Sequence, residues 1–186
     1  MMRPAYIVLI LIGVLVLAFL LRRPGRMHAK YRSAAEKLHK RFLSGELSGA
    51  QGIGYLRKID PYVFEELVLD GFQANGYRVI RNNRYSGDGG IDGRVQYNGK
   101  TYLIQCKRYK SYIQISHVEE FGRLCEEAGL YGFFVHTGKT GAGSWEGKSR
   151  RIRFVSGERL LSLLSGKDNP EAPIGTVRKD SNQNQS

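Results

Sequence analysis

Residues 91–109 read IDGRVQYNGKTYLIQCKRY, and this stretch decides the fold. Two runs of alternating apolar and polar residues flank the pair Asn98-Gly99. An Asn-Gly pair tolerates positive φ at both positions, so it is the strongest short-range signal for a two-residue β-hairpin turn. The turn fixes the register of the hairpin, in which Tyr97 faces Lys100.

The register sorts the hairpin into two faces, because successive side chains of a strand point to opposite sides. One face is apolar and suits a core; it holds Ile91, Val95, Tyr97, Tyr102, Ile104 and Cys106. The other holds Asp92, Arg94, Gln105 and Lys107, with Asp92 opposite Gln105. Opposed Cβ atoms lie roughly 5 Å apart, which is close enough for both side chains to ligate one ion. A solvated polar face is the alternative interpretation.

The polar face suits metal-assisted cleavage of a phosphodiester. Mg²⁺, or Mn²⁺ in its place, takes oxygen ligands. Asp92 offers a carboxylate, Gln105 an amide oxygen and Cys106 its backbone carbonyl. Such an ion lowers the pKa of a bound water and neutralises charge on the phosphate. Lys107 would position the attacking water and stabilise the developing negative charge.

These residues carry a resemblance to a known family. Residues 87–92 (GDGGID) and 105–109 (QCKRY) resemble the catalytic domain of the Mrr-type restriction endonucleases, within the PD-(D/E)XK nuclease superfamily. The resemblance spans roughly residues 60–165. It implies the following roles: Asp92 and Gln105 as metal-site residues, Lys107 as the catalytic lysine, Glu65 as an accessory acid, and Asp88 as a further candidate.

The first helix of this region begins with Asp60 as N-cap and Pro61 at its first position. Its apolar stripe consists of Phe64, Leu67, Val68, Leu69 and Phe72. Glu65 falls inside the arc of the stripe, whereas Glu66 and Asp70 fall outside it. A carboxylate on the packed side is costly unless it is paired or metal-bound. The helix therefore favours Glu65 as the functional acid, with a glutamate at the edge of the stripe as the alternative.

The remaining patterns complete an α/β fold. They are a strand over 77–80, a helix opened by a capping box of Ser116 and Glu119, a buried strand over 130–137, a strand over 152–155 and a helix over 158–164. This order predicts a restriction-endonuclease-like sandwich, a mixed central sheet flanked by helices. Two phosphate-loop-like triplets in 138–149 lack the required earlier glycine, so we expect no nucleotide cofactor.

Several basic residues are candidates for contact with the DNA backbone. They are Arg108 after the second hairpin strand and Lys148, Arg150 and Arg151 near Trp145, and Asp88 is a further candidate for DNA contact. A solvated basic loop is the alternative interpretation of residues 148–153.

The N-terminus carries seventeen uncharged residues, 5–21, dominated by Ile, Leu and Val. This length is at the short end for a transmembrane helix, which takes about 17–25 residues. A cleaved signal peptide is the alternative, but Arg22-Arg23-Pro24 stands where small residues are expected. The basic residues after the segment place the rest of the chain in the cytoplasm, as a single-pass protein of the inner membrane.

The charge is distributed unevenly along the chain, whose formal net charge is +12. Residues 22–58 carry ten Lys and Arg against two acids, and residues 60–165 carry fifteen against twelve. Most of the excess therefore lies beside the apolar segment, where it suits anionic lipid as well as DNA. Cys106 and Cys125 form no metal-ligand spacing or disulfide framework.

These observations predict four regions: an anchor over 1–21, a basic connector over 22–58 with a short amphipathic helix and a flexible break at 48–52, a nuclease domain over 59–165, and a disordered tail over 166–186. The predicted function is a membrane-anchored, Mg²⁺-dependent DNA endonuclease. Its expected partners are DNA, the membrane and a second copy of the chain. The alternatives are a catalytically inactive DNA-binding module and a membrane-anchored interaction protein.

Overall fold

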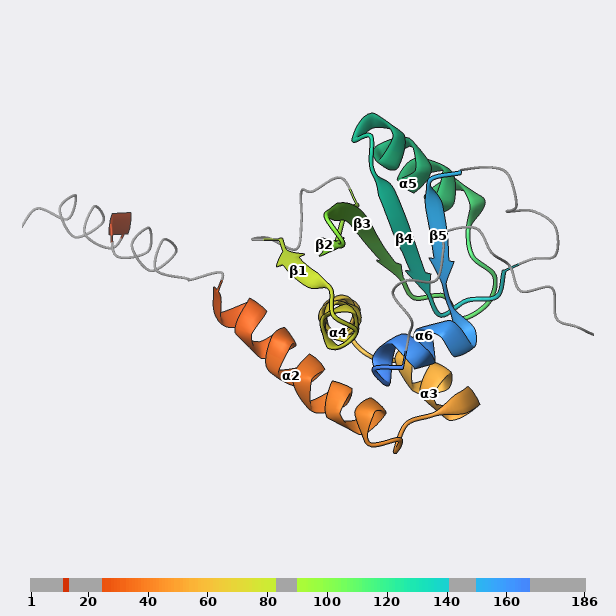
Figure 1. Cartoon of the computed structure of the whole chain (residues 1–186). Coiled ribbons are helices and arrows are strands. Elements are labelled where there is room, and N and C mark those ends of the chain that lie inside the picture. Colours follow the sequence, from red (N-terminus) through yellow and green to blue (C-terminus); the bar gives the residue numbers. More distant parts are fainter. Residues whose placement is uncertain (1–11, 14–24, 83–89, 141–149, 168–186) are drawn as a thin grey trace, which may run out of the picture.

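The computed structural model describes residues 12–13, 25–82, 90–140 and 150–167 (Figure 1). Five strands form one sheet in the order β1-β2-β3-β4-β5. They are β1 (Arg78–Arg81), β2 (Gly93–Tyr97), β3 (Lys100–Lys107), β4 (Tyr131–His136) and β5 (Ile152–Val155). The first three strands are antiparallel neighbours, and β3, β4 and β5 are parallel. The predicted mixed sheet is confirmed.

Helices cover both faces of this sheet and bury an apolar cluster on each side (Figure 1). On one side lie α4 (Pro61–Ala74) and α6 (Gly157–Leu164), with α2 (Gly25–Leu43) and α3 (Gly49–Leu56) packed onto them. On the other side, α5 (Ile115–Glu127) packs against β4 and β5. From α4 onward, the order of elements is the predicted one.

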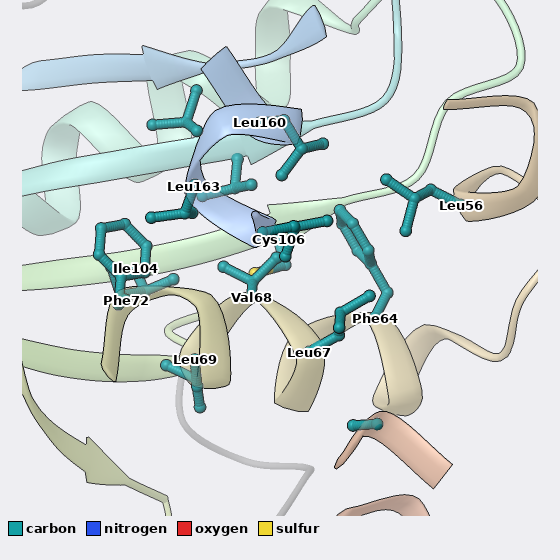
Figure 2. Packing of buried hydrophobic residues seen from close by; sticks show 14 of the residues in the cluster. Leu56, Phe64, Leu67, Val68, Leu69, Phe72, Ile104, Cys106, Leu160 and Leu163 are labelled. Carbon is teal, nitrogen blue, oxygen red and sulfur yellow. The ribbon is translucent and has the colours of Figure 1, made fainter. Parts of the chain in front are cut away.

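Helix α4 is the main bridge between the helices and the sheet. The carboxylate of Asp60 accepts hydrogen bonds from the amides of Tyr62 and Val63, which confirms the predicted N-cap. Figure 2 shows the helix's apolar side chains packed among those of β3 and α6; the labelled residues include Phe64, Val68, Phe72, Ile104, Cys106, Leu160 and Leu163. This packing fixes α4, and every residue on it, relative to the end of β3.

The hairpin of β2 and β3 has the predicted turn and register. Asn98 and Gly99 have φ values of 47° and 74°, the left-handed conformation that the turn requires. Tyr97 faces Lys100, and the same register continues through Val95 and Tyr102 to Gly93 and Ile104. The local turn chemistry was therefore sufficient to align the two strands.

The beginning of α5 differs from the prediction. The helix begins at Ile115 after an extended Gln114 that makes no side-chain cap, so the predicted capping box of Ser116 and Glu119 is wrong. The physical reason lies one residue earlier, where the amide of Ile113 donates to the carbonyl of Lys139 and holds the chain extended up to the helix.

Residues 25–56 are part of the folded domain. The predicted amphipathic helix is confirmed as α2, but the predicted flexible break is wrong, because α3 begins at Gly49. Both helices and the loop between them bury side chains in the same core as α4: Ala35, Leu38, Phe42, Leu47 and Leu56. A Cβ on Gly52 would lie 3.1 Å from Leu161 and 3.3 Å from Phe42, so glycine permits this close approach.

Within the described part of the chain, no helix combines the length and apolarity needed to cross a bilayer. The predicted anchor over residues 5–21 falls outside the described residues, except for Ile12 and Gly13. The predicted tail beyond Lys167 also falls outside them. The anchor and the tail both stay predictions.

Candidate active site

A β-bulge lies at Asp92, directly before β2. Gly93 is the register partner of Ile104, yet the amide of Asp92 also donates to the Ile104 carbonyl, at 2.8 Å. Two residues of one strand thus oppose a single residue of the other, which is the pattern of a bulge. The bulge shifts the faces by one residue, and Ile91 packs in the cluster on the α5 side of the sheet. The prediction that Ile91 shares the apolar face of Val95 and Ile104 is wrong.

The bulge also changes the direction in which the Asp92 carboxylate points. Its Oδ2 accepts a hydrogen bond from the Cys106 amide at 2.6 Å, which ties it to the end of β3. Gly93 is required beside it, because a Cβ there would lie 2.9 Å from a methyl group of Leu69 on α4. Asp92 is therefore held by the backbone at the end of β3, instead of standing directly opposite Gln105 as the regular register predicted.

Glu65 of α4 meets Asp92 at this end of the sheet. Burial raises the pKa of Glu65 to about 8, and the negative charge of Asp92 adds to the rise. Burial also raises the pKa of Asp92 to about 6, although the Cys106 amide and the charge of Lys107 oppose the shift. Two half-buried carboxylates that interact in this way favour either a shared proton or a cation between them.

Lys107 ends β3 beside both carboxylates. Its positive charge lowers the pKa of Glu65 and of Asp92. Its backbone carbonyl accepts from the Thr137 amide at 3.3 Å, so the strand end is held against the end of β4. The structure thus brings together Glu65, Asp92 and Lys107, which lie far apart in sequence.

Gln105 lies in the same neighbourhood but is not solvated. The side chain is only 1% exposed, and its Nε2 donates to the carbonyl of Gly90 at 2.7 Å. Among the described residues, its Oε1 has no hydrogen-bond partner. A buried acceptor without a partner is costly, so this oxygen suits an unseen donor or cation. The predicted direct opposition of Gln105 and Asp92 is replaced by a contact with Gly90, two residues before Asp92.

The oxygens at this end of the sheet fit a hard divalent cation. Asp92 and Glu65 supply interacting carboxylates, and Gln105 supplies a buried amide oxygen. Within the described residues, no three His, Cys, Asp or Glu side chains gather into a metal-binding group. Such a set would not be needed, since Mg²⁺ is commonly held by one or two carboxylates and several waters.

Glu66 has a structural role that the helical periodicity did not reveal. It is buried and forms an ion pair with Arg81 of β1 at 2.9 Å, while Asp70 contacts the same guanidinium at 2.5 Å. Burial raises the pKa of Asp70 to about 6, against the opposing charge of Arg81. The prediction that Glu66 lies outside the packed face is wrong, because β1 covers that side of α4.

We expect Glu66→Ala to destabilise the fold. Removing one partner of a buried ion pair costs about 3–5 kcal/mol, and the low end applies because Asp70 still neutralises Arg81. The measurement is the free energy of unfolding in urea. Glu127→Ala on α5 is the matched control, since its ion pair with Arg123 is exposed and such pairs contribute roughly 0–1 kcal/mol. Equal losses in both variants would contradict the buried pair's role.

The predicted DNA-contact residues lie in different places. Arg108 donates to the backbone carbonyls of Arg57 and Ile59, so it ties β3 to the segment before α4. The Arg151 guanidinium stacks over the ring of Tyr131, at the opposite end of the sheet from Lys107. Arg150 precedes it and is exposed. Asp88 and Lys148 lie outside the described residues.

Two histidines lie near the end of β3. His136 faces Lys107 across the sheet, is fully buried, and packs against the rings of Phe134 and Phe154. Burial lowers its pKa to about 4, which fits the structural role that is commoner for a lone histidine. The ring of His117 is half-buried against Tyr109, whereas the prediction had it exposed.

Comparison with family models gives a match over more than half of the chain. The Mrr catalytic-domain model, described as a restriction endonuclease, matches residues 56–164. The chain belongs to this family. No curated protein matches the chain. Membership confirms the resemblance read from the sequence, and the α/β fold with its mixed five-stranded sheet is consistent with a nuclease of this kind.

The Mrr-type domain begins in the middle of a packed unit. The matched region starts at Leu56, yet α2 and all but the last residue of α3 precede it and share its core. Arg57 donates to the carbonyl of Thr137 at 3.0 Å, next to the end of β4. Together with Arg108, it fastens the α3–α4 junction to the end of the sheet where Asp92 and Lys107 lie. The sequence offered no signal for these long-range contacts.

Proposed function

We propose that this Mrr-type domain is a Mg²⁺-dependent DNA endonuclease. The observation that carries the proposal is the meeting of Glu65, Asp92 and Lys107 where β3 ends. A structural ion pair alone needs one acid and one base. Here two half-buried carboxylates with raised pKa values share a site with one lysine, and perturbed groups of this kind are typical of catalytic sites.

Each residue has a role in this proposal. Asp92 and Glu65 would hold the cation with the Cys106 carbonyl, and the buried Oε1 of Gln105 would accept from one of its waters. When bound, the ion would neutralise charge on the scissile phosphate and lower the pKa of a water. Lys107 would orient the attacking water and stabilise the negative charge that develops on the phosphate.

The direct test is cleavage of supercoiled plasmid by the full chain, purified in a neutral detergent. We expect nicked or linear products with Mg²⁺ or Mn²⁺, and none with excess chelator or with Ca²⁺ alone. The readout is the conversion of supercoiled plasmid on an agarose gel. DNA binding without cleavage under all these conditions would favour the alternative, an inactive DNA-binding module.

Membrane anchoring is a further part of the proposal. It is supported by the seventeen uncharged residues 5–21 and the basic residues that follow them. We expect the full chain to sediment with membranes and to resist carbonate extraction, with the nuclease domain on the cytoplasmic side. Recovery of a soluble protein shortened near Leu21 would instead indicate a cleaved signal peptide.

A further inference from the structure

Two segments run side by side directly beyond the candidate active site. Residues 109–113 follow β3, and residues 137–140 follow β4, its parallel neighbour. We call these two segments together the ledge. Ligands of α/β sheets bind at the carboxyl ends of parallel strands, and the ledge lies at the carboxyl ends of β3 and β4.

Hydrogen bonds join the two segments along their length. Thr137 Oγ1 accepts from the Tyr109 amide and donates to the Tyr109 carbonyl, both at 3.0 Å. The Lys139 amide donates to the Ser111 carbonyl at 2.9 Å, and the Ile113 amide donates to the Lys139 carbonyl at 3.2 Å. The ledge is therefore a short two-stranded platform rather than a pair of independent loops.

Packing on both sides makes this platform rigid. A Cβ on Gly138 would lie 2.8 Å from both the Ser111 carbonyl and Tyr109 Cβ, so the segments approach as closely as glycine permits. The Tyr109 hydroxyl bonds His117 Nδ1 at 2.7 Å, which fastens the ledge to α5. Ile113 is 6% exposed and anchors the far end in the core.

The outer surface of the ledge is aromatic and basic. Tyr112 is 62% exposed, more than any other large hydrophobic side chain in the described residues. Lys110 and Lys139, one from each segment of the ledge, are also exposed. Residues 109–113 and 137–140 contain two lysines and no acid. An aromatic ring among cations is the composition of surfaces that bind single-stranded nucleic acid.

We propose that the ledge binds the DNA strand beside the cleaved phosphate. Tyr112 stacks on an unpaired base, while Lys110 and Lys139 contact the flanking phosphates. The proposal rests on the proposed nuclease function and adds a substrate class to it. A base inside a continuous duplex has both faces covered by its neighbours, so a ring can stack only where the duplex is gapped, frayed or unpaired.

The test compares a continuous duplex with one that contains a short single-stranded gap. Binding of the full chain in neutral detergent is followed by fluorescence anisotropy, with Ca²⁺ in place of Mg²⁺. We expect tighter binding to the gapped duplex. Tyr112→Ala should weaken that binding about tenfold, the size expected for one stacked base, whereas Tyr112→Phe should keep the stacking and the affinity.

Matched controls come from the opposite end of the sheet. Tyr131→Ala removes another exposed tyrosine, at the beginning of β4, and should leave the affinity unchanged. Lys110→Ala and Lys139→Ala should each reduce the slope of log K against log salt by about 0.7–0.9, whereas Lys100→Ala in the hairpin turn should not.

The outcomes separate this proposal from the proposed function. If Tyr112→Ala binds the gapped duplex with wild-type affinity and the chain cleaves DNA with Mg²⁺, the proposed role of the ledge is wrong and the proposed nuclease function stands. If binding depends on Tyr112 but the chain cleaves no DNA, the proposed role of the ledge is supported and the proposed nuclease function is wrong. Equal wild-type affinity for both duplexes overturns the ledge.

Discussion

Asp92→Asn is expected to abolish plasmid cleavage while the chain stays folded. The substitution keeps the size of the side chain and an oxygen that can accept from the Cys106 amide, but it removes the charge that would hold a cation. Loss of one positioned group that stabilises charge typically costs on the order of 10²–10³ in rate, and the loss here should be at least that large. Initial cleavage rates at several Mg²⁺ concentrations measure it.

Asp60→Asn is the matched control for this variant. Asp60 is the N-cap of α4, and asparagine caps a helix about as well as aspartate. The control should therefore cleave at close to the wild-type rate and melt at close to the same temperature. Undiminished cleavage by Asp92→Asn over the whole Mg²⁺ range would overturn the assignment of the site.

Lys107→Ala should also stop cleavage, but for a different reason. Lys107 would act on the attacking water and on the developing charge, so its loss should not prevent cation binding. Calorimetric titration with Mn²⁺ should show binding to Lys107→Ala. The same titration should show little binding to Asp92→Asn. The site then divides into a part that holds the ion and a part that completes the chemistry.

Lys100→Ala removes an exposed lysine from the other end of the same strand and serves as the control. It should cleave normally. Normal cleavage by Lys107→Ala, with the fold intact, would assign the lysine a structural role and leave the reaction without its proposed charge stabiliser.

The local parts of the fold were predictable because local chemistry decides them. Asn98-Gly99 determines the turn and the register, and Asp60-Pro61 determines where α4 begins. The bulge at Asp92 was not predicted, although a signal was present. Gly93 stands inside a strand pattern, and an isolated glycine there indicates a bulge or a close approach.

The parts of the fold that were predicted wrongly depend on contacts between residues far apart in the sequence. A helical periodicity predicts one packed face, whereas α4 contacts strands β1, β2 and β3 of the sheet and also packs against α2 and α6. That extra cover is why Glu66 is buried, whereas the role of Glu65 as the functional acid stays a prediction. In the same way, the glycine-rich start of α3 resembles a flexible break until Phe42 and Leu161 pack against Gly52.

The packing of α2 against α4 limits where the proposed nuclease can act. If residues 5–21 are an anchor, the chain between residue 21 and the first residue of α2 can extend only about 14 Å, at roughly 3.5 Å per residue. Helix α2 is packed onto the domain through Ala35, Leu38 and Phe42, so it does not lengthen the flexible connection to the anchor. Such an enzyme would be tethered close to the membrane, and its substrates would be the DNA molecules that come to the membrane surface.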